Sequence, residues 1–203
     1  MQVLKLKDVG CAMSFFIAGK IPCEESMTDE LLDVVNDKDI IIGKEMRSTV
    51  HQLGLQHRGV HVFLFTQDGK MLVQKRSADR VSSPSMLDCS VSEHVKAGES
   101  YLDAAIRGMK EEMGVDGIEI KPLVRFRMNY GINDNEISTL YEGVVEPDKV
   151  KFDSVEIEEI NYYNLDELQE MIKAGNIKFC VWFVELLNWY LGKPAKMNLD
   201  FRA

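Results

Sequence analysis

After residue 32 the chain alternates between apolar runs and short polar steps. Four apolar runs stand out, at residues 32–35, 40–43, 59–65 and 71–76. Asn and Asp residues separate the first pair of runs, and these residue types favour tight turns. The second pair flanks the step Asp68-Gly69, which is a strong signal for a hairpin turn. The pattern therefore predicts two β-hairpins in the first half of the chain.

The spacing of apolar residues changes between residues 100 and 113. Apolar side chains recur there at intervals of three and four, at Leu102, Ala105, Ile106, Met109 and Met113. This period predicts a helix that buries those five side chains. Gly114 marks the expected end of the helix, because glycine readily adopts the left-handed conformation that ends many helices.

The second half of the chain predicts more strands and then two helices. The strands are expected at residues 118–120, 123–130, 137–145 and 160–163, and the helices at 165–174 and 179–191. Strands interrupted by one helix and followed by helices are typical of a mixed α/β sandwich. We predict an N-terminal extension at 1–33, which contains a short strand at 3–6, one domain at 34–192 and a C-terminal tail at 193–203.

Composition and charge narrow the classes of function. The chain has 24 Lys and Arg against 33 Asp and Glu, a formal net charge of -9, and no cluster of basic residues, so we expect no nucleic-acid partner. No apolar run approaches the ~18 residues that a membrane span needs, so we expect no membrane partner. The four cysteines form no CxxC pair, which favours a reduced, cytoplasmic protein without disulfides or a structural zinc site.

Residues 93–115 resemble the Nudix box, G-x5-E-x7-R-E-U-x-E-E-x-G-U, in which U is an aliphatic residue. Seven of its nine specified positions match, namely Glu99, Arg107, Met109, Glu111, Glu112, Gly114 and Val115. Glu93 stands in place of the first Gly, and Gly108 stands in place of a Glu. The resemblance implies a Nudix α/β/α sandwich with a mixed sheet and a pyrophosphohydrolase that depends on Mg²⁺ or Mn²⁺.

The physical chemistry of the helix supports this interpretation. Positions 108, 111 and 112 share one helical face, where adjacent carboxylates repel each other unless a cation compensates them. Oxygen ligands are what Mg²⁺ prefers, so we expect Glu111 and Glu112 to hold the metal and to be catalytic. Glu99 lies eight residues before Arg107, and we expect the two to form a structural ion pair.

Residues 32–190 are also similar to the branch of the Nudix superfamily that groups isopentenyl diphosphate isomerases with hydrolase-like relatives. The similarity rests on segments such as His57-Arg58-Gly59-Val60-His61 and Ser83-Pro84-Ser85-Met86-Leu87-Asp88. Isomerases of that branch bind a metal through histidines and acidic residues. The resemblance therefore implies a metal site made of His57, His94, Asp134 and Glu136.

Two departures from the isomerase pattern argue against isomerisation. The isomerase cysteine should lie two residues before His94, where this chain has Ser92, and a hydroxyl is a poorer proton donor than a thiol. Cys89 lies further upstream and is expected to pack as a small core residue. The isomerase tryptophan is expected near residues 177–178, and Trp182 lies beyond that point, on the predicted apolar face of the last helix.

The sequence is compatible with three functions. We favour a divalent-metal-dependent pyrophosphohydrolase that acts on a small-molecule substrate of the nucleoside diphosphate type. An isopentenyl diphosphate isomerase and a catalytically impaired nucleotide-binding module are the alternatives, and Gly108 favours the last of these. A glutamate at position 108 is expected to raise turnover by adding a third carboxylate. The oligomeric state stays open, a homodimer included.

Residues outside the box complete the expected site. Glu136 is the first choice for a catalytic base in place of the missing box glutamate, with Glu156, Glu158 and Glu159 as alternatives. Basic residues near the predicted strand ends are expected to bind the diphosphate, namely Arg58, Arg76 and Arg127.

Overall fold

The structure is a computed structural model, and it describes residues 29–199 of the 203-residue chain. The strand expected at residues 3–6 lies outside this range. The elements run in the order β1 (Leu31–Val35), β2 (Ile41–Met46), α1 (Arg47–Leu53), β3 (His57–Phe65), β4 (Met71–Arg76), β5 (Leu87–Asp88), β6 (Val91–His94), α2 (Tyr101–Met113), β7 (Ile120–Asn129), β8 (Asn135–Val144), the short 3-10 helix η1 (Pro147–Lys149), β9 (Ile157–Tyr163), α3 (Leu165–Ala174) and α4 (Val181–Tyr190).

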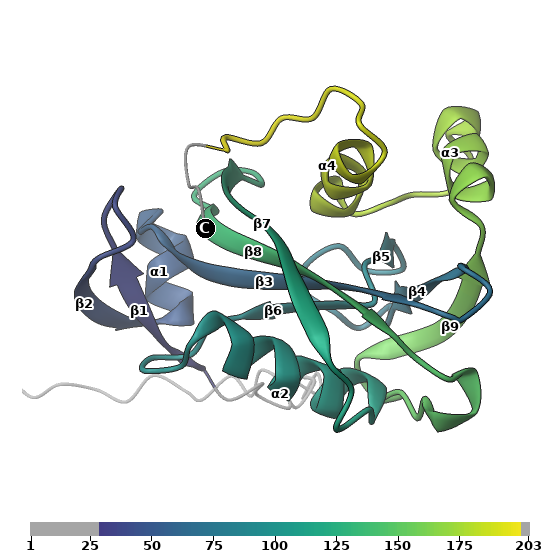
Figure 1. The fold of residues 1–203 in the computed structure, drawn as a ribbon. Helices are drawn as coiled ribbons and strands as arrows, with labels where there is room; N and C mark the ends of the chain where they lie inside the picture. The colour runs from purple at the N-terminus through teal and green to yellow at the C-terminus, as the bar shows by residue number, and fades with distance from the viewer. Residues whose placement is uncertain (1–28, 200–203) are drawn as a thin grey trace, which may run out of the picture.

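A seven-stranded mixed sheet forms the centre of the molecule. Its main path runs β5-β4-β3-β8-β7, while β6 pairs with β3 and β9 pairs with β4. Strands β3 and β8 are parallel, and the other pairs in this sheet are antiparallel. Helix α2 covers one face, and α3 and α4 lie on the other (Figure 1). This arrangement is the α/β/α sandwich that the sequence predicts.

Alternation along β3 supplies a core on each face of the sheet. Val60, Val62 and Leu64 point to the side of α2, where they pack with Met109 and Met113. The residues between them face the other way, because side chains alternate across a strand. On that side Phe63 and Phe65 pack with residues of α4 such as Phe183 and Leu186. The sheet therefore separates two apolar layers.

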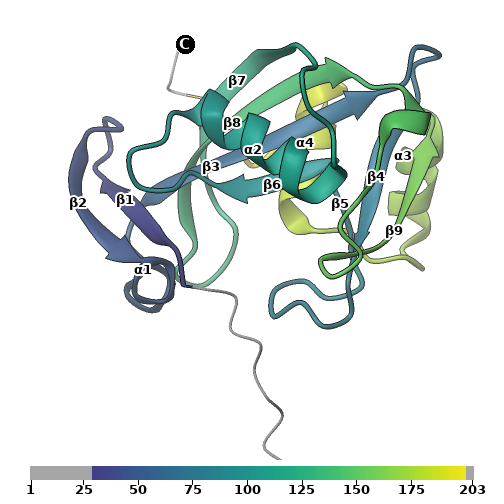
Figure 2. The same ribbon diagram turned by 90° about the horizontal axis from the view of Figure 1, so that it is seen from below.

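The hairpin of β1 and β2 packs with α1 at one end of the sandwich (Figure 2). Asp39 anchors its turn, because its carboxylate accepts hydrogen bonds from Nε of Arg58 at 2.5 Å and from the hydroxyl of Tyr101 at 3.1 Å. The guanidinium of Arg125 lies over the Tyr101 ring, 4.2 Å from its centroid. These contacts join the hairpin to β3, α2 and β7.

Helix α2 buries three of the five predicted side chains, Ala105, Met109 and Met113. Leu102 and Ile106 are 44% and 40% exposed, so the prediction that they are buried is wrong. The face against the sheet also carries the small residues Ala104 and Gly108, together with Tyr101 and Glu112. The small side chains let the helix lie close to β6, and this close approach replaces the wider aliphatic contact that the period suggested.

The other predicted elements are largely present. Both hairpins are confirmed, and α3 spans the predicted residues. The prediction of a separate strand at 118–120 is wrong, because β7 runs without a break from Ile120 to Asn129. The structure also contains helix α1 and the short strands β5 and β6, which the sequence pattern does not predict. Within residues 29–199, no helix combines the length and the apolar composition that crossing a membrane requires.

Candidate metal centre and active site

Five side chains from four parts of the chain meet at one end of β3. We call this cluster the histidine centre, and it consists of His51, His57, His94, Asp134 and Glu136. His51 lies on α1, His57 begins β3 and His94 ends β6. Asp134 lies in the turn before β8, and Glu136 is the second residue of that strand.

The potential ligand atoms of the histidine centre lie close to one another. Nε2 of His51 is 3.3 Å from Nε2 of His94, and Nε2 of His57 is 3.5 Å from Oε1 of Glu136. Oδ1 of Asp134 lies 3.4 Å from Nδ1 of His51 and 4.0 Å from Nε2 of His57. Nitrogen and oxygen donors therefore converge on one small volume.

Strand register explains why these residues meet. His57 is the direct partner of Glu136 in the parallel pair of β3 and β8, and Gly59 is the partner of His94 in the antiparallel pair of β3 and β6. Glycine at position 59 leaves space beside β8. A Cβ there would lie 3.0 Å from Cδ of Glu136 and 2.9 Å from Oγ of Ser138. The carboxylate of Glu136 therefore occupies the space that a side chain at 59 would need.

The charges in the histidine centre depend on one another. Burial opposes charge on Glu136, but the close approach and charge of His57, whose Nε2 lies 3.5 Å from Oε1, outweigh it and lower the pKa of Glu136. Burial also opposes charge on His57, and the same interaction with Glu136 outweighs it and raises the pKa of His57. Burial, followed by repulsion from Glu136, raises the pKa of Asp134 to about 6. The two carboxylates therefore require a nearby positive charge, which the proton on His57 provides.

The histidine centre has donors suited to a divalent metal ion. Nε2 of His57 and Oδ1 of Asp134 are buried and have no hydrogen-bond partner among the described residues. Nδ1 of His57 lies 3.1 Å from the carbonyl oxygen of Leu55, which leaves Nε2 directed into the cluster. Metal-binding histidines are commonly oriented in this way, and mixed imidazole and carboxylate sets suit Mn²⁺, Fe²⁺ and Zn²⁺. A divalent ion would replace the proton on His57 as the compensating charge.

Ser92 belongs to a buried polar network next to the histidine centre on β6. Its Oγ lies 3.2 Å from Oδ1 of Asp88 and 3.1 Å from Nδ1 of His61. Nε2 of His61 lies 3.0 Å from the hydroxyl of Tyr130. Trp182 donates its indole N–H to the same Oδ1 of Asp88 at 2.5 Å. The Ser92 hydroxyl, where the resemblance leads one to expect a thiol, is therefore held by both an acid and an imidazole.

The position of Trp182 adds a contact that the sequence did not predict. Its ring lies 5.7 Å from that of Tyr130, and it shares Asp88 with Ser92. Although Trp182 lies beyond the position expected for the isomerase tryptophan, the structure brings its indole to the network of Ser92. Because α4 crosses the face of the sheet that carries Ser92, the first turn of the helix brings the indole there. Cys89 is buried, and burial raises the pKa of its thiol well above the usual value, as expected for a core residue.

Arg107 organises the Nudix box. Its Nε donates to Oε1 of Glu99 at 2.9 Å, and one terminal nitrogen donates to the backbone oxygen of His94 at 2.8 Å. The other terminal nitrogen donates to Glu93 at 3.1 Å and to Glu111 at 3.0 Å. A single side chain therefore holds the loop before α2, the strand β6 and the helix itself.

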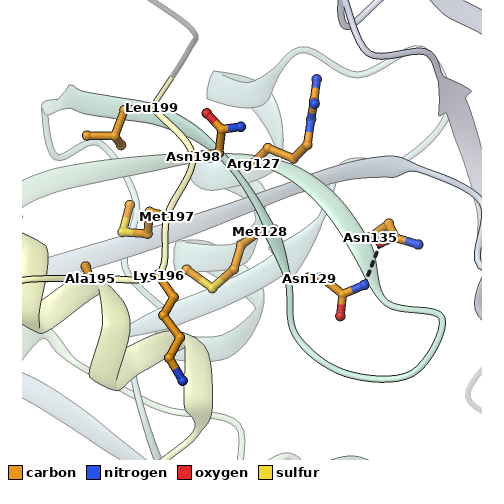
Figure 3. Close-up of a pocket in the computed structure, with 9 residues that line it drawn as sticks. All are labelled: Arg127, Met128, Asn129, Asn135, Ala195, Lys196, Met197, Asn198 and Leu199. Carbon is orange, nitrogen blue, oxygen red and sulfur yellow. Dashed lines mark hydrogen bonds between the residues drawn. The ribbon is translucent and has the colours of Figure 1, made fainter.

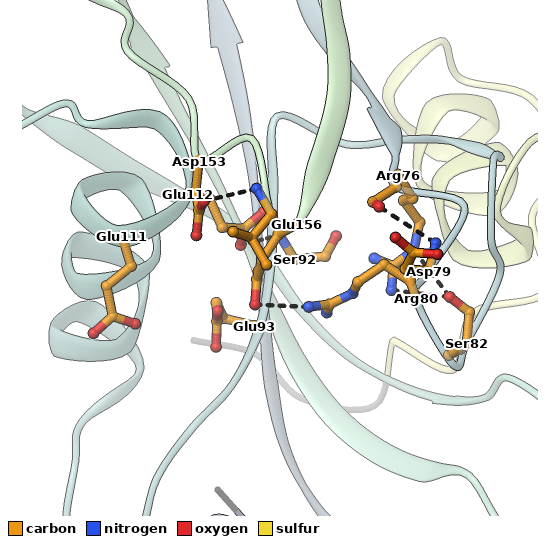
Figure 4. A network of polar contacts seen from close by, with 12 residues as sticks. Arg76, Asp79, Arg80, Ser82, Ser92, Glu93, Glu111, Glu112, Asp153 and Glu156 are labelled. Atoms are coloured by element: carbon orange, nitrogen blue, oxygen red, sulfur yellow. Dashed lines mark hydrogen bonds and ion pairs between the residues drawn. The ribbon is translucent and has the colours of Figure 1, made fainter. Parts of the chain in front are cut away.

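The two helical glutamates predicted to bind metal face different surroundings (Figure 4). Glu112 points toward β6, where its carboxylate accepts hydrogen bonds from Nε2 of Gln74 at 2.6 Å and from the backbone N–H of Ser92 at 3.3 Å. Burial, and then the negative charge of Glu93, raises the pKa of Glu112 well above its usual value. The side chain of Glu111 is 54% exposed and pairs with Arg107. The structure does not bring either glutamate into the histidine centre.

The three arginines predicted to bind a diphosphate all contact protein groups. Arg58 pairs with Asp39 at the hairpin turn, and Arg76 is buried against Asp88 at 3.0 Å. Arg127 donates to the backbone oxygen of Asp37 at 2.6 Å. Arg127 also lines an open pocket of about 730 Å³ between β7 and the segment 195–199 (Figure 3). Of the three, only Arg76 lies in the network of Ser92.

His51 is a member of the histidine centre that the sequence analysis did not identify. It lies in α1, and no periodic pattern predicts that helix. The available signal was the spacing of six residues between His51 and His57, with Gly54 between them. Gly54 adopts the left-handed conformation, with φ of 67°, at the end of α1. The chain therefore turns back there and places both imidazoles on one side.

Comparison with known proteins identifies the family. The Nudix domain model matches residues 55–183. A Nudix hydrolase of Streptomyces coelicolor is 33% identical over 155 residues, which cover 76% of this chain and 84% of that protein. Isopentenyl-diphosphate Delta-isomerase 2 of Photorhabdus laumondii is 31% identical over 163 residues, covering 79% and 92% of the two chains. The chain therefore belongs to the Nudix family, in the branch similar to isopentenyl diphosphate isomerases.

Solved structures support the same fold. The crystal structure of DR0079 from Deinococcus radiodurans aligns with a TM-score of 0.67 at 25% identity and covers 79% of this chain and 98% of that one. The structure of a MutT protein from Methanosarcina mazei aligns with a TM-score of 0.57 at 17% identity, covering 68% and 94%. The expected Nudix sandwich is confirmed.

Proposed function

We propose that this protein is a divalent-metal-dependent pyrophosphohydrolase acting on a small molecule of the nucleoside diphosphate type, with Mg²⁺ or Mn²⁺ as cofactor. The family membership supports a hydrolase. The observation that carries the metal dependence is the pair of buried ligand atoms without hydrogen bonds, Nε2 of His57 and Oδ1 of Asp134, inside a cluster of five potential ligands. Such atoms are costly to bury unless a cation binds them.

The residues of the site have distinct roles in this proposal. His51, His57, His94, Asp134 and Glu136 hold one divalent ion, and the carboxylates of α2 hold Mg²⁺ together with the substrate diphosphate. When bound, these ions neutralise the diphosphate and lower the pKa of a water molecule. Glu136 is a ligand because its pKa is lowered. Glu112 is the preferred general base, because burial and the charge of Glu93 raise its pKa, whereas His57 lowers that of Glu136.

Ser92 and Arg107 position these groups. The backbone N–H of Ser92 holds Glu112, and the Ser92 hydroxyl is fixed by Asp88 and His61. Arg107 ties β6 to α2 through Glu93, Glu111 and the carbonyl of His94. The histidine centre and the helix carboxylates are therefore held on the same short strand, a requirement for acting on one substrate.

A panel of nucleoside diphosphate derivatives tests the proposal. Each compound is incubated with Mg²⁺ or Mn²⁺, and the release of a nucleoside monophosphate is followed by chromatography. We expect turnover that EDTA abolishes and that Glu112→Gln lowers by about 10²-fold to 10⁴-fold, the usual contribution of a general base. The control is Glu119→Gln, an exposed carboxylate beyond α2. Binding of nucleotides without turnover would instead indicate the impaired module.

Isomerisation is the second candidate, because two observations favour it. The histidine centre has the histidine and carboxylate composition that the resemblance implies for isomerases, and Trp182 lies beside the network of Ser92. The absent thiol argues against it. We expect no conversion of isopentenyl to dimethylallyl diphosphate by the unaltered protein. Ser92→Cys is the informative variant, since Trp182 and Ser92 share Asp88, and isomerisation by the unaltered protein would reverse the ranking.

A further inference from the structure

His61 links two hydroxyl groups in a buried chain of hydrogen bonds. It lies on β3 directly opposite Ser92 on β6, so the two side chains share one face of the sheet. Nδ1 of His61 lies 3.1 Å from Oγ of Ser92, and Nε2 lies 3.0 Å from the hydroxyl of Tyr130. Oγ of Ser92 in turn lies 3.2 Å from Oδ1 of Asp88. Both ring nitrogens of His61 therefore have a protein partner.

The Asp88 end of this chain only accepts hydrogen bonds. Oδ1 of Asp88 accepts from the indole N–H of Trp182 at 2.5 Å and from the backbone N–H of Cys89 at 2.7 Å. Oδ2 accepts from Arg76 at 3.0 Å. Each of these donors needs a lone pair, so the group is present as the carboxylate, which has no proton to donate. The hydroxyl of Ser92 must therefore donate to Asp88, because two facing lone pairs at 3.2 Å would repel each other.

This direction fixes the position of the proton on His61. Because the proton of Ser92 points to Asp88, Oγ is an acceptor toward His61, and Nδ1 must carry the hydrogen. Burial lowers the pKa of His61, so the ring is neutral and Nε2 keeps a lone pair that accepts from the Tyr130 hydroxyl. In the reverse arrangement Nε2 would donate, and the hydroxyl of Tyr130 would have to turn to Oγ of Ser138 at 3.4 Å. Ser92 would also lose its hydrogen bond to Asp88, so the Nδ1–H form is favoured.

The hydroxyl of Ser92 acts on Glu112 through the backbone. The N–H of Ser92 donates to Oε1 of Glu112 at 3.3 Å. Hydrogen bonds on both sides of Oγ hold residue 92 in one rotamer, and this restricts the amide of the same residue. We propose that His61 is a positioning residue, whose Nδ1–H form locks Ser92 and thereby orients the carboxylate of Glu112. The inference rests on the proposed function, in which Glu112 is the general base.

NMR of the imidazole nitrogens tests the form of His61 without any substrate. The chain has four histidines, and the spectra of His61 variants identify the signals of this one. With isotope-labelled histidine at neutral pH, we expect hydrogen on Nδ1 and a lone pair on Nε2. Ser92→Ala removes the acceptor, and we expect the hydrogen to move to Nε2. A lone pair on Nδ1 of the unaltered protein, or hydrogen on both nitrogens, would overturn the inference.

Two substitutions of His61 separate positioning from packing. The amide nitrogen of asparagine is attached to Cγ, as Nδ1 is, so His61→Asn keeps a donor for Ser92. The amide nitrogen of glutamine lies one atom further out, as Nε2 does, so His61→Gln places it near Tyr130 instead. We expect His61→Gln to lower kcat for the best nucleoside diphosphate substrate by about 10-fold to 100-fold with little change in KM, the scale of a misplaced catalytic group. His61→Asn should recover most of this loss.

Hydrogen exchange at the Ser92 amide gives the same comparison without turnover. We expect this amide to exchange faster in His61→Gln than in His61→Asn. The amide of Val95, which donates to the backbone oxygen of Arg58 at 3.0 Å, should exchange alike in both. Equal protection of the Ser92 amide in the two variants would overturn the positioning role.

The two kinds of readout distinguish this inference from the proposed function. Absence of turnover in every protein, together with the expected tautomer and exchange, would overturn the hydrolase and support the link from His61 to Glu112. Turnover that falls equally in His61→Asn and His61→Gln would overturn the positioning role and leave the hydrolase intact. Should His61→Gln fail to fold, the tautomer of the unaltered protein and its response to Ser92→Ala still decide.

Discussion

The Nε2 atoms of His51 and His94 lie 3.3 Å apart, although the two residues are 43 positions apart in the sequence. Two protonated imidazoles would repel each other strongly at this distance. Burial, and then the charge of His57, lowers the pKa of His51 to about 4, and burial lowers the pKa of His94 well below its usual value. Both rings are neutral at pH 7 and offer lone pairs to a metal ion.

Metal binding should therefore stabilise the protein. We expect Zn²⁺ or Mn²⁺ at 100 times its dissociation constant to raise the free energy of unfolding by about 2.7 kcal/mol, since the unfolded chain lacks the site. His94→Gln should remove most of this response. His61→Gln is the matched control, because His61 is the one histidine of the four in the chain that lies outside the histidine centre. Calorimetric melting with and without EDTA measures the effect, and an equal loss in both variants would contradict the assignment.

Substitution of Gly59 should disable the histidine centre without touching a ligand. The Cβ of an alanine at 59 would lie 2.9 Å from Oγ of Ser138 and 3.0 Å from Cδ of Glu136, so the carboxylate must move. We expect Gly59→Ala to weaken Zn²⁺ binding by at least about 10-fold, the scale on which disturbed ligand support acts. Gly69→Ala in the turn after β3 is the control for a glycine with open space around it. Unchanged Zn²⁺ affinity in Gly59→Ala would show that Glu136 is no ligand.

Arg107 should be the most sensitive charged residue of α2. Removing it leaves Glu93, Glu99 and Glu111 without their shared cation, and Glu93 is largely buried. We expect Arg107→Met to lower the free energy of unfolding by about 3 kcal/mol, which is usual when one partner of a buried ion pair is removed. Lys110→Met, on the same helix and paired with exposed Asp116, should change it by less than about 1 kcal/mol. Urea titrations of the two variants measure the difference.

His61 should make stability depend on pH. Burial lowers its pKa below the ordinary 6.5, although Glu136 and Asp88 attract the charged form. The unfolded chain therefore takes up a proton at His61 before the folded protein does. The stabilisation is complete above about pH 6.5 and is lost as the pH falls below that value, by at most about 1.4 kcal/mol for each pH unit. Urea unfolding between pH 5 and 8 should show a shallower loss for His61→Gln, and parallel curves would contradict this account.

Local sequence signals predicted much of the fold and part of the site. The step Asp68-Gly69 predicted a hairpin because only a few residue types adopt tight turn geometry, and the Nudix box predicted both the loop and the helix around Arg107. The two histidines, the aspartate and the glutamate expected from the resemblance do meet. These features are determined by residues that are close together in the sequence, so a local pattern is enough to predict them.

The features that escaped prediction depend on contacts between distant elements. Trp182 reaches Asp88 because α4 crosses the sheet, and the spacing to earlier motifs does not reveal that crossing. Leu102 and Ile106 fit the apolar period of α2, yet the helix turns its small residues to β6 because the strand lies close. The contact between Glu93 and Gly108 also could not be predicted from the sequence, where the two residues are separate mismatches to the Nudix box.

The parallel pairing of β3 and β8 sets the order of events during folding. It places His57 beside Glu136, so the histidine centre cannot exist until the chain has closed a loop of nearly eighty residues. Pairings of such long sequence separation are slow to form, because the chain entropy is lost before the contact is gained. A metal ion that recognises only the finished centre cannot guide the chain toward it. An ion bound at the proposed centre would instead act after folding by slowing unfolding, and its removal would show first as a shorter lifetime of the native state.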